Sequence, residues 1–145
     1  MRAQLDLSTD PGDYPFCHAV RVRFAETDAM AVAHHGAHLT YLEAARVEYL
    51  RALGRPYADL RADGLDLAVL EVFVQYRRSA RFDELVEVHT RVASFGAATL
   101  QLDYLLMVDG EICATGCTVH GVVDQEGRAR RAPVWLRDLL VPAAG

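Results

Sequence analysis

The sequence predicts an α+β fold in which an antiparallel five-stranded sheet wraps around one long central helix. Three observations point to this class. A single segment with apolar residues at helical spacing lies early in the chain, between about residues 39 and 53. One strand-like segment precedes it, and four follow it. Tight turns join these four strands, which indicates antiparallel pairing.

The chain begins with a segment that has no clear periodicity. Residues 1–15 include the turn sequence Asp10-Pro-Gly-Asp13, so we expect a flexible N-terminal arm. Residues 16–145 are then long enough for one domain with its own core. Polar and apolar residues alternate from His18 to Phe24, which predicts a half-buried strand. Residues 26–37 are irregular and rich in small side chains, which predicts a loop.

The long helix is apolar around most of its circumference, from Leu39 to Leu53, so other structure must enclose it. Gly54 is a typical C-terminal cap, and Pro56 prevents the helix from continuing. A short helical turn is expected next, up to Ala62. A second short helix is expected at residues 133–140.

Four strands are predicted between these two short helices, at residues 65–77, 84–95, 98–108 and 112–124. Asp109-Gly110 is a strong signal for a two-residue hairpin, and Gly96 and Glu126-Gly127 indicate further hairpins. In the connection between the first two of these strands, Arg81 and Asp83 are expected to form a salt link. The sheet would keep an open edge and outer face, which favours association with a second copy.

Composition excludes several classes of protein. Fifteen basic and twenty acidic residues give a net charge of −5, which disfavours nucleic acids and anionic membranes as partners. We find no signal peptide and no stretch of about 18 apolar residues, so we expect a soluble cytoplasmic protein. Three cysteines without paired metal spacing, Cys17, Cys113 and Cys117, fit unpaired thiols in a reducing compartment.

The loop before the long helix holds the residues best suited to chemistry. Asp28 precedes His35, near the expected helix start, by seven residues. A helix start offers unpaired N–H groups and a partial positive charge, which can polarise a carbonyl and hold an oxyanion. If the loop folds back, Asp28 could attack that carbonyl or act as a base on water, and both roles stay open. A loop-bracing aspartate or helix cap is the structural alternative.

His34, His35 and His38 would suit a metal site with Asp28, but no His-Glu-x-x-His pattern supports one, and we expect no metal. We expect His35 to contribute its backbone N–H and His38 to pack as a polar residue at the rim. Glu43 is a second acid near the same pocket, or else an ion-pair partner of Arg46.

Several arginines could bind a phosphate-rich nucleotide, because guanidinium groups match phosphate oxygens, although a solvated basic rim is an equal alternative. They are Arg77, Arg78, Arg128 and Arg130. The sequence contains no Gly-x-Ser-x-Gly, Walker or Gly-x-Gly-x-x-Gly motif, which removes the main support for serine hydrolase, ATP and NAD functions.

The segment from Val22 to His35, followed by Leu39 to Arg46, resembles the hotdog acyl-CoA thioesterases of the 4-hydroxybenzoyl-CoA type and of the Tol–Pal-associated type. The Glu-Thr-Asp loop joined to its helix is the most specific part. The likeness continues through residues 54–57, 76–83 and 124–130, and so covers nearly everything from Arg21 to Leu140.

The resemblance implies a hotdog fold, acyl-CoA thioesterase activity, and no cofactor, since CoA is part of the substrate. It implies that Asp28 is the catalytic carboxylate and that the N–H of His35 polarises the thioester. It also implies a homodimer or homotetramer, with acyl group and pantetheine arm at a subunit interface. The residues expected to contact substrate are Ala31, Val32, His34, His38, Glu43, Arg78, Arg128 and Arg130, of which Arg130 best matches the nucleotide site.

Two positions depart from the family pattern. Ala31 stands where the loop usually carries glycine, and His38 stands where the helix entry usually has an aromatic residue. Both affect the expected acyl specificity, and neither removes the carboxylate. Two alternatives share the fold: a non-catalytic acyl-CoA-binding module, and an enoyl-CoA hydratase or dehydratase. The second alternative is less consistent with the sequence, since its relatives place a loop histidine near several prolines that this loop lacks.

Overall fold

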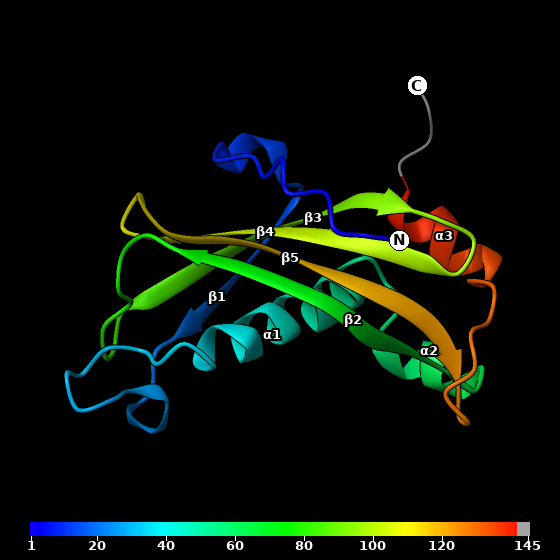
Figure 1. Ribbon diagram of the computed structural model, residues 1–145, viewed down its shortest axis with the longest axis horizontal. Coiled ribbons are helices and arrows are strands. Elements are labelled where there is room, and N and C mark those ends of the chain that lie inside the picture. The colour runs from blue at the N-terminus through cyan, green and yellow to red at the C-terminus, as the bar shows by residue number, and fades with distance from the viewer. Residues whose placement is uncertain (142–145) are drawn as a thin grey trace.

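The computed structural model describes residues 1–141 of the chain. One antiparallel sheet curves around the long helix α1 (Ala37–Ala52), with its strands in the order β1-β3-β4-β5-β2 (Figure 1). The strands are β1 (Phe16–Arg21), β2 (Leu65–Tyr76), β3 (Leu85–Phe95), β4 (Thr99–Val108) and β5 (Glu111–Asp124). Short helical segments are η1 (Pro11–Asp13), η2 (Phe24–Glu26), α2 (Tyr57–Ala62) and α3 (Val134–Leu140). The predicted α+β hotdog fold is confirmed.

Helix α1 fills the concave face of the sheet. It buries Tyr41, Leu42 and Ala45 against the inner residues of the strands, in one continuous core. Gly54 ends the helix with a φ of 92°, a left-handed conformation that favours glycine, as the sequence predicts. Leu39 is exposed, however, because the β2 side of the helix opens toward the free edge of the sheet.

The connection between β2 and β3 is a crossover. β2 pairs with β5, whereas β3 lies between β1 and β4, so the expected tight turn between β2 and β3 is wrong. The expected Arg81–Asp83 salt link is also wrong, since no ion pair joins these residues in the described part of the chain. Arg78 stabilises the crossover instead, because its guanidinium contacts Glu84 and Glu111 at 3.1 Å each.

The turns within the remaining sheet follow the sequence more closely. Asp109 and Gly110 both have positive φ values, 49° and 79°, as a two-residue hairpin turn of type I′ requires. Gly96 lies in the turn between β3 and β4. After β5 the chain turns at Gly127, where only an isolated bridge, Val123 to Ala129, pairs the two sides.

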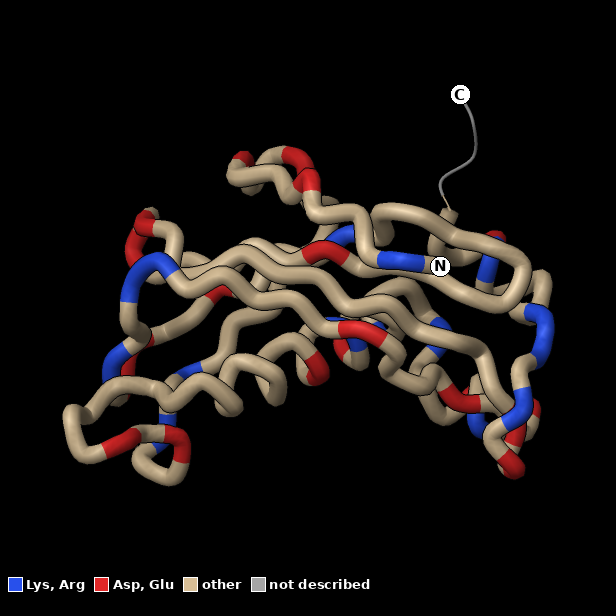
Figure 2. The backbone as a smooth tube through the Cα atoms, viewed as in Figure 1, with Lys and Arg blue, Asp and Glu red and all other residues tan. Residues whose placement is uncertain are grey.

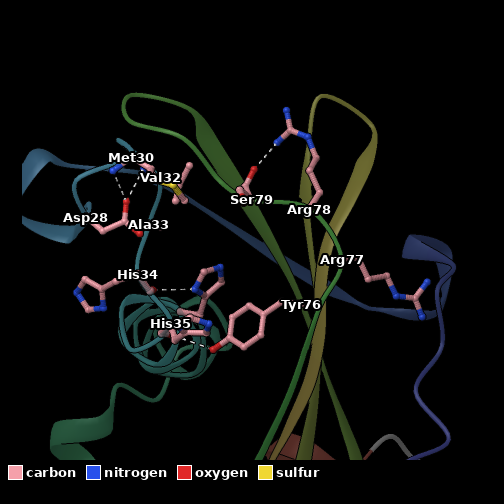
Figure 3. A pocket seen from close by; sticks show the side chains of 11 residues that line it. Asp28, Met30, Val32, Ala33, His34, His35, Tyr76, Arg77, Arg78 and Ser79 are labelled. Carbon is pink, nitrogen blue, oxygen red and sulfur yellow. Dashed lines mark hydrogen bonds between the residues drawn. The ribbon is translucent and has the colours of Figure 1, made fainter.

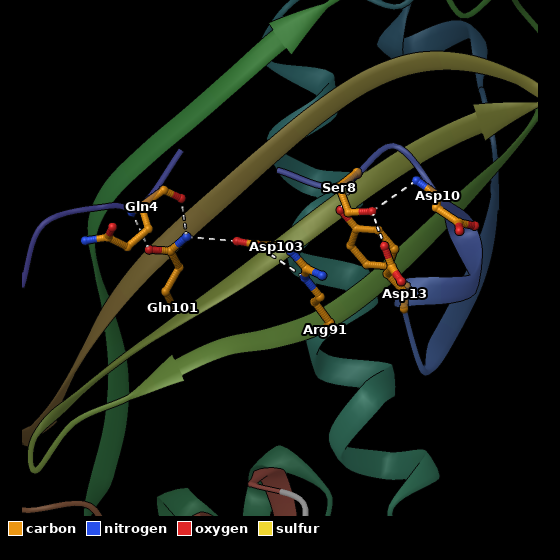
Figure 4. A network of polar contacts seen from close by, with 8 residues as sticks. Gln4, Ser8, Asp10, Asp13, Arg91, Gln101 and Asp103 are labelled. Atoms are coloured by element: carbon orange, nitrogen blue, oxygen red, sulfur yellow. Dashed lines mark hydrogen bonds and ion pairs between the residues drawn. The ribbon is translucent and has the colours of Figure 1, made fainter. Parts of the chain in front are cut away.

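The N-terminal residues 1–15 lie on the outer face of the sheet, opposite α1 (Figures 1 and 4). The backbone N–H of Ala3 donates a hydrogen bond to Glu71 on β2, at 2.9 Å. Gln4 accepts one from the buried side chain of Gln101 on β4 and donates one to it, both at 2.8 Å. These contacts give the segment fixed partners on two strands, and its flexibility stays a prediction.

Tyr14 attaches the end of the same segment to the sheet. Its ring is buried, and the Arg91 guanidinium lies over it at 5.0 Å. Arg91 also forms an ion pair with the buried Asp103 at 3.0 Å, so a connected polar network covers this face (Figure 4). No helix within residues 1–141 is long and apolar enough to cross a membrane.

Candidate active site

A cleft of about 310 Å³ opens between the loop before α1, the first turn of α1 and the end of β2 (Figure 3). It brings together most of the residues that the sequence singles out, although they come from separate elements. The lining residues are Asp28, Met30, Val32, Ala33, His34, His35, His38, Tyr76, Arg77, Arg78 and Ser79.

The loop holds its shape through its own backbone and one buried acid. The N–H of Asp28 donates to the carbonyl of Val32 at 2.9 Å, which folds residues 28–32 into a tight turn. Ala31 lies at the tip with a φ of 60°. At the base of the loop, the buried carboxylate of Glu26 accepts a hydrogen bond from the Tyr41 hydroxyl of α1 at 2.7 Å. The loop is therefore fixed relative to the helix.

Asp28 has one oxygen engaged and one available. Its Oδ1 accepts a hydrogen bond from the N–H of Met30 at 2.8 Å and approaches that of Val32 at 3.5 Å (Figure 3). Within residues 1–141, no donor contacts Oδ2. The carboxylate thus braces the loop, as the structural alternative predicts, and still presents an unpaired oxygen in the cleft.

The start of α1 leaves two backbone amides without partners. The N–H of Ala37 donates to the His34 carbonyl at 3.1 Å and contacts the His34 Nδ1 at 3.2 Å. The N–H of His38 donates to the His35 carbonyl at 3.3 Å. In contrast, the N–H groups of His35 and Gly36 have no acceptor among the described residues. They lie at the positive end of the helix, where a developing oxyanion would be stabilised.

Tyr76, which the sequence interpretation missed as a site residue, positions the helix start. Its hydroxyl donates to the His35 carbonyl at 2.9 Å, and its ring forms edge contacts with His35 and His38 at 5.1 and 4.8 Å between centroids. The only sequence signal was its place at the start of the 76–83 segment. Its contacts depend on β2 ending beside α1, which no local pattern indicates.

His38 is buried, with 3% of its surface exposed, so the expectation that it packs as a polar rim residue is wrong. The first turn of α1 points this side chain inward, between Tyr76 and Tyr41. Its Nδ1 lies 3.2 Å from the His34 carbonyl, while its Nε2 is buried with no partner in residues 1–141. Burial lowers the pKa of His38, which favours the neutral imidazole.

The two arginines that line the cleft differ in whether an acidic side chain already pairs with them. Arg78, an expected substrate-binding residue, is occupied by Glu84 and Glu111, and its hydrogen bonds with Glu84 raise its pKa above the ordinary value. Its neighbour Arg77 is exposed and has no ion pair within the described residues. Arg77 is therefore better placed to meet a phosphate group of a ligand.

Other expected site residues lie outside the cleft. Ala31 is at the loop tip and does not line it. Glu43 lines a separate groove between α1 and β2, and within the described chain it forms no ion pair with Arg46. Arg128 and Arg130 follow β5, which ends across the molecule from the loop before α1 (Figures 1 and 2), and Arg130 pairs with Asp124 at 2.9 Å.

The cleft does not resemble a metal centre in its geometry. Within residues 1–141, the ligand atoms of the loop histidines and Asp28 do not converge closely enough to share one ion. What the cleft offers is the Asp28 carboxylate and the free amide of His35, with the free amide of Gly36 next to it in the chain. This combination suits attack on a carbonyl carbon whose oxygen is held by N–H donors.

Comparison with known proteins gives a consistent family. The sequence-family model of the thioesterase-like superfamily matches residues 22–140 of the chain. The chain is 34% identical to the acyl-CoA thioesterase YbgC of Haemophilus influenzae over 96 residues, 66% of this chain and 71% of that protein. A hypothetical protein of Thermus thermophilus, TT1821, is similar in structure with a TM-score of 0.81 and 39% identity, covering 86% of this chain and 95% of that one.

A third similar protein is the DHNA-CoA thioesterase of Staphylococcus aureus. It shares 31% identity and a TM-score of 0.76, and the match covers 79% of this chain and 78% of that one. These proteins share both the fold and much of the chain length. The family is therefore shown by sequence as well as by structure.

Proposed function

Because the chain belongs to the thioesterase-like superfamily and is a thioester hydrolase, we propose that it hydrolyses acyl-CoA to a free acid and CoA in the cleft at Asp28. The relatives named acyl-CoA and DHNA-CoA thioesterases act on substrates of this class. One observation carries the proposal: an aspartate with a free oxygen shares a cleft with His35, whose backbone amide is unpartnered at the start of a helix.

The proposed chemistry uses the amides of His35 and Gly36 as an oxyanion hole. The thioester carbonyl oxygen accepts hydrogen bonds from them, and the helix dipole stabilises the negative charge that develops on that oxygen. Asp28 then either attacks the carbonyl carbon, expelling the CoA thiolate and leaving a mixed anhydride that water hydrolyses, or takes a proton from an attacking water. Both routes remain open.

The surrounding residues have supporting roles in this proposal. His34 and Tyr76 hold the backbone at the helix start, which fixes the position of the two free amides. Ala31 sets the turn at the loop tip, Val32 lines the cleft, and the buried His38 packs in the first turn of α1. Arg77 meets the phosphates of CoA. No cofactor beyond the substrate is needed.

We also propose a homodimer formed along β2, with a homotetramer as a pair of such dimers. β2 is an edge strand, and Val69, Leu70 and Val72 on it are exposed. An unpaired edge with exposed apolar side chains is suited to pairing with a second copy. This assembly and a cytoplasmic location remain proposals.

Two-fold antiparallel pairing at β2 would complete the cleft. Such pairing sets the Leu65 end of one β2 beside the Tyr76 end of the other. Leu65 is paired with Asp124 at the end of β5, and the turn with Arg128 and Arg130 follows directly. Arg130 of the partner subunit would thus approach the cleft, which accounts for its distance from Asp28 within one chain.

A turnover assay with a panel of short, long and aromatic acyl-CoAs, with free thiol as the readout, tests the activity. We expect Asp28→Asn to lower kcat by about 10²–10⁴-fold, because the nucleophile or base is lost. Asp109→Asn is the matched control, since Asn is equally suited to its hairpin turn. A folded Asp28→Ala protein with the wild-type rate would refute the assignment.

The same assay separates the alternatives. Binding without release of CoA would indicate a binding module, and absorbance changes of an enoyl-CoA would indicate a hydratase. A single turnover in ¹⁸O-water tests the nucleophilic role of Asp28. Label incorporated into the Asp28 carboxylate indicates the anhydride route, whereas label only in the free acid fits either general-base catalysis or attack of water on the acyl carbon of the anhydride.

A further inference from the structure

Three side chains with metal-binding atoms meet on the outer face of the sheet, apart from the cleft. Cys17 on β1 lies directly opposite His89 on β3 in the strand register. Glu87 precedes His89 by two residues and shares its face, because side chains alternate along a strand. The cysteine sulfur, the histidine nitrogen and the carboxylate oxygen all lie within 4.8 Å of one another.

The spacing of these atoms fits a single small ion. Zinc binds cysteine sulfur at about 2.3 Å and histidine nitrogen at about 2.0–2.1 Å with tetrahedral angles, so sulfur and nitrogen on one ion are about 3.6 Å apart. The Cys17 Sγ and His89 Nε2 atoms are 4.0 Å apart. A small change in side-chain torsion closes that difference without movement of the strands.

We propose that Cys17, Glu87 and His89 form a binding site for a divalent transition metal of the zinc class. The mixed sulfur, nitrogen and oxygen donors favour Zn²⁺ or Co²⁺ over Mg²⁺ and Ca²⁺, which prefer oxygen ligands alone. Cys17 binds as the thiolate, and its proton passes to the solvent. Because Cys17 is exposed, the ion has an entry path, and water takes its fourth position.

The ion would cross-link the edge strand β1 to its neighbour β3. β1 is at the edge of the sheet and pairs only with β3, over six residues. Metal bound by the folded protein stabilises it in proportion to the logarithm of metal concentration over Kd. None of the three ligands lines the cleft at Asp28, so hydrolysis does not require this metal.

Titration of the tag-free protein with Co²⁺ tests the site. Thiolate ligation gives a near-ultraviolet charge-transfer band, and competition with Zn²⁺ gives the affinity. The ligand variants are Cys17→Ser, Glu87→Gln and His89→Ala. His18→Ala is the matched control, because His18 neighbours Cys17 on β1 but lies on the inner face. Melting curves in a chelator establish first that each variant is folded.

We expect one ion per chain in the wild type and in His18→Ala, with a thiolate band that Zn²⁺ removes. Losing a residue that only orients a ligand costs about 10–100-fold in affinity, so each ligand variant should bind at least about tenfold more weakly. Zn²⁺ should raise the melting temperature of the wild type more than that of Cys17→Ser at the same metal concentration. The absence of the band in the wild type or its persistence in Cys17→Ser would overturn the proposal. A loss of metal affinity in His18→Ala equal to that in the ligand variants would also overturn it.

Discussion

At the scale of single residues, Ala31 carries the clearest strain near the site. Its φ of 60° is left-handed, a conformation that costs a residue with a Cβ roughly 1–2 kcal/mol and costs glycine little. The family that the sequence resembles usually has glycine at this position. The loop thus keeps the backbone shape suited to glycine, and alanine tolerates it at a cost in free energy.

We therefore expect Ala31→Gly to raise the free energy of unfolding by about 0.5–1 kcal/mol, since the relieved strain exceeds the added chain entropy of glycine. Urea denaturation measures the change. Ala29→Gly is the matched control in the same loop, where φ is not positive, and it should give no gain. Equal stabilisation by both substitutions would contradict this explanation.

The sequence predicted those residues of the candidate site that lie close together in the chain. Asp28 and His35 could be predicted because a carboxylate and a helix start lie seven residues apart in one loop. Arg78 was an expected ligand residue, yet Glu84 and Glu111 occupy it, and Arg77 is the free neighbour. The distinction depends on ion pairs with residues from other elements, which spacing alone does not reveal.

At the scale of elements, the contact between the end of β2 and the start of α1 controls the site. Tyr76→Phe removes the hydrogen bond to the His35 carbonyl. We expect kcat to fall by about tenfold as the free amides lose their alignment, with a stability loss of about 1 kcal/mol. Steady-state kinetics and urea denaturation measure the two effects.

Tyr57→Phe serves as the control for this prediction. Its hydroxyl donates to Asp66 and accepts from the Leu67 N–H, at the other end of β2 from Tyr76. Tyr57→Phe should lower the free energy of unfolding by a similar amount and leave kcat unchanged. If both variants lower kcat equally, the contact at His35 has no special role in turnover.

Local patterns predicted the elements better than their pairing. The four later strands match their expected ranges to within one residue or so, because alternation and turn residues are local signals. β1 ends at Arg21, earlier than expected, because the Glu26 carboxylate accepts the N–H of Arg23 and closes η2. The β2–β3 connection was wrong because pairing partners are chosen by contacts distant in sequence.

At the scale of the whole molecule, the free edge of β2 links assembly to activity. We expect Val72→Glu to place a charge on the proposed interface, where Val72 is 45% exposed, and to yield monomers with kcat/KM lowered by about 10–100-fold. Light scattering and turnover measure both effects. Val134→Glu, on α3 and 73% exposed, is the control and should change neither. A fully active Val72→Glu monomer would show that one chain suffices.

The buried His120 makes stability depend on pH. Burial, helped by the positive charge of Arg46, lowers its pKa to about 3, while its Nε2 contacts Thr118 at 2.8 Å. In the unfolded chain a histidine titrates near 6.5, so below that pH the unfolded state binds a proton that the folded state excludes. Stability is therefore full above about pH 6.5 and falls toward pH 3, by up to about 1.4 kcal/mol per unit.

Urea denaturation between pH 7.5 and 5 measures this slope. His120→Gln should flatten it, whatever its effect on absolute stability, because glutamine does not titrate. The buried His38 contributes in the same direction and accounts for a residual slope. Leu106→Ala is the control, because it truncates a buried side chain that does not titrate, and it should lower stability while keeping the wild-type slope. An unchanged slope in His120→Gln would exclude this residue as the source.

The strand order has a consequence for how the chain acquires its fold. β3, β4 and β5 form a meander from one contiguous stretch, residues 85–124, joined by short turns. β1 and α1 lie before this stretch, so during synthesis the loop with Asp28 has no sheet to dock on until the meander leaves the ribosome. Locally paired strands close quickly, whereas distant pairs close late. The nascent N-terminal half thus passes through a stage with an apolar helix uncovered, which chaperones would recognise.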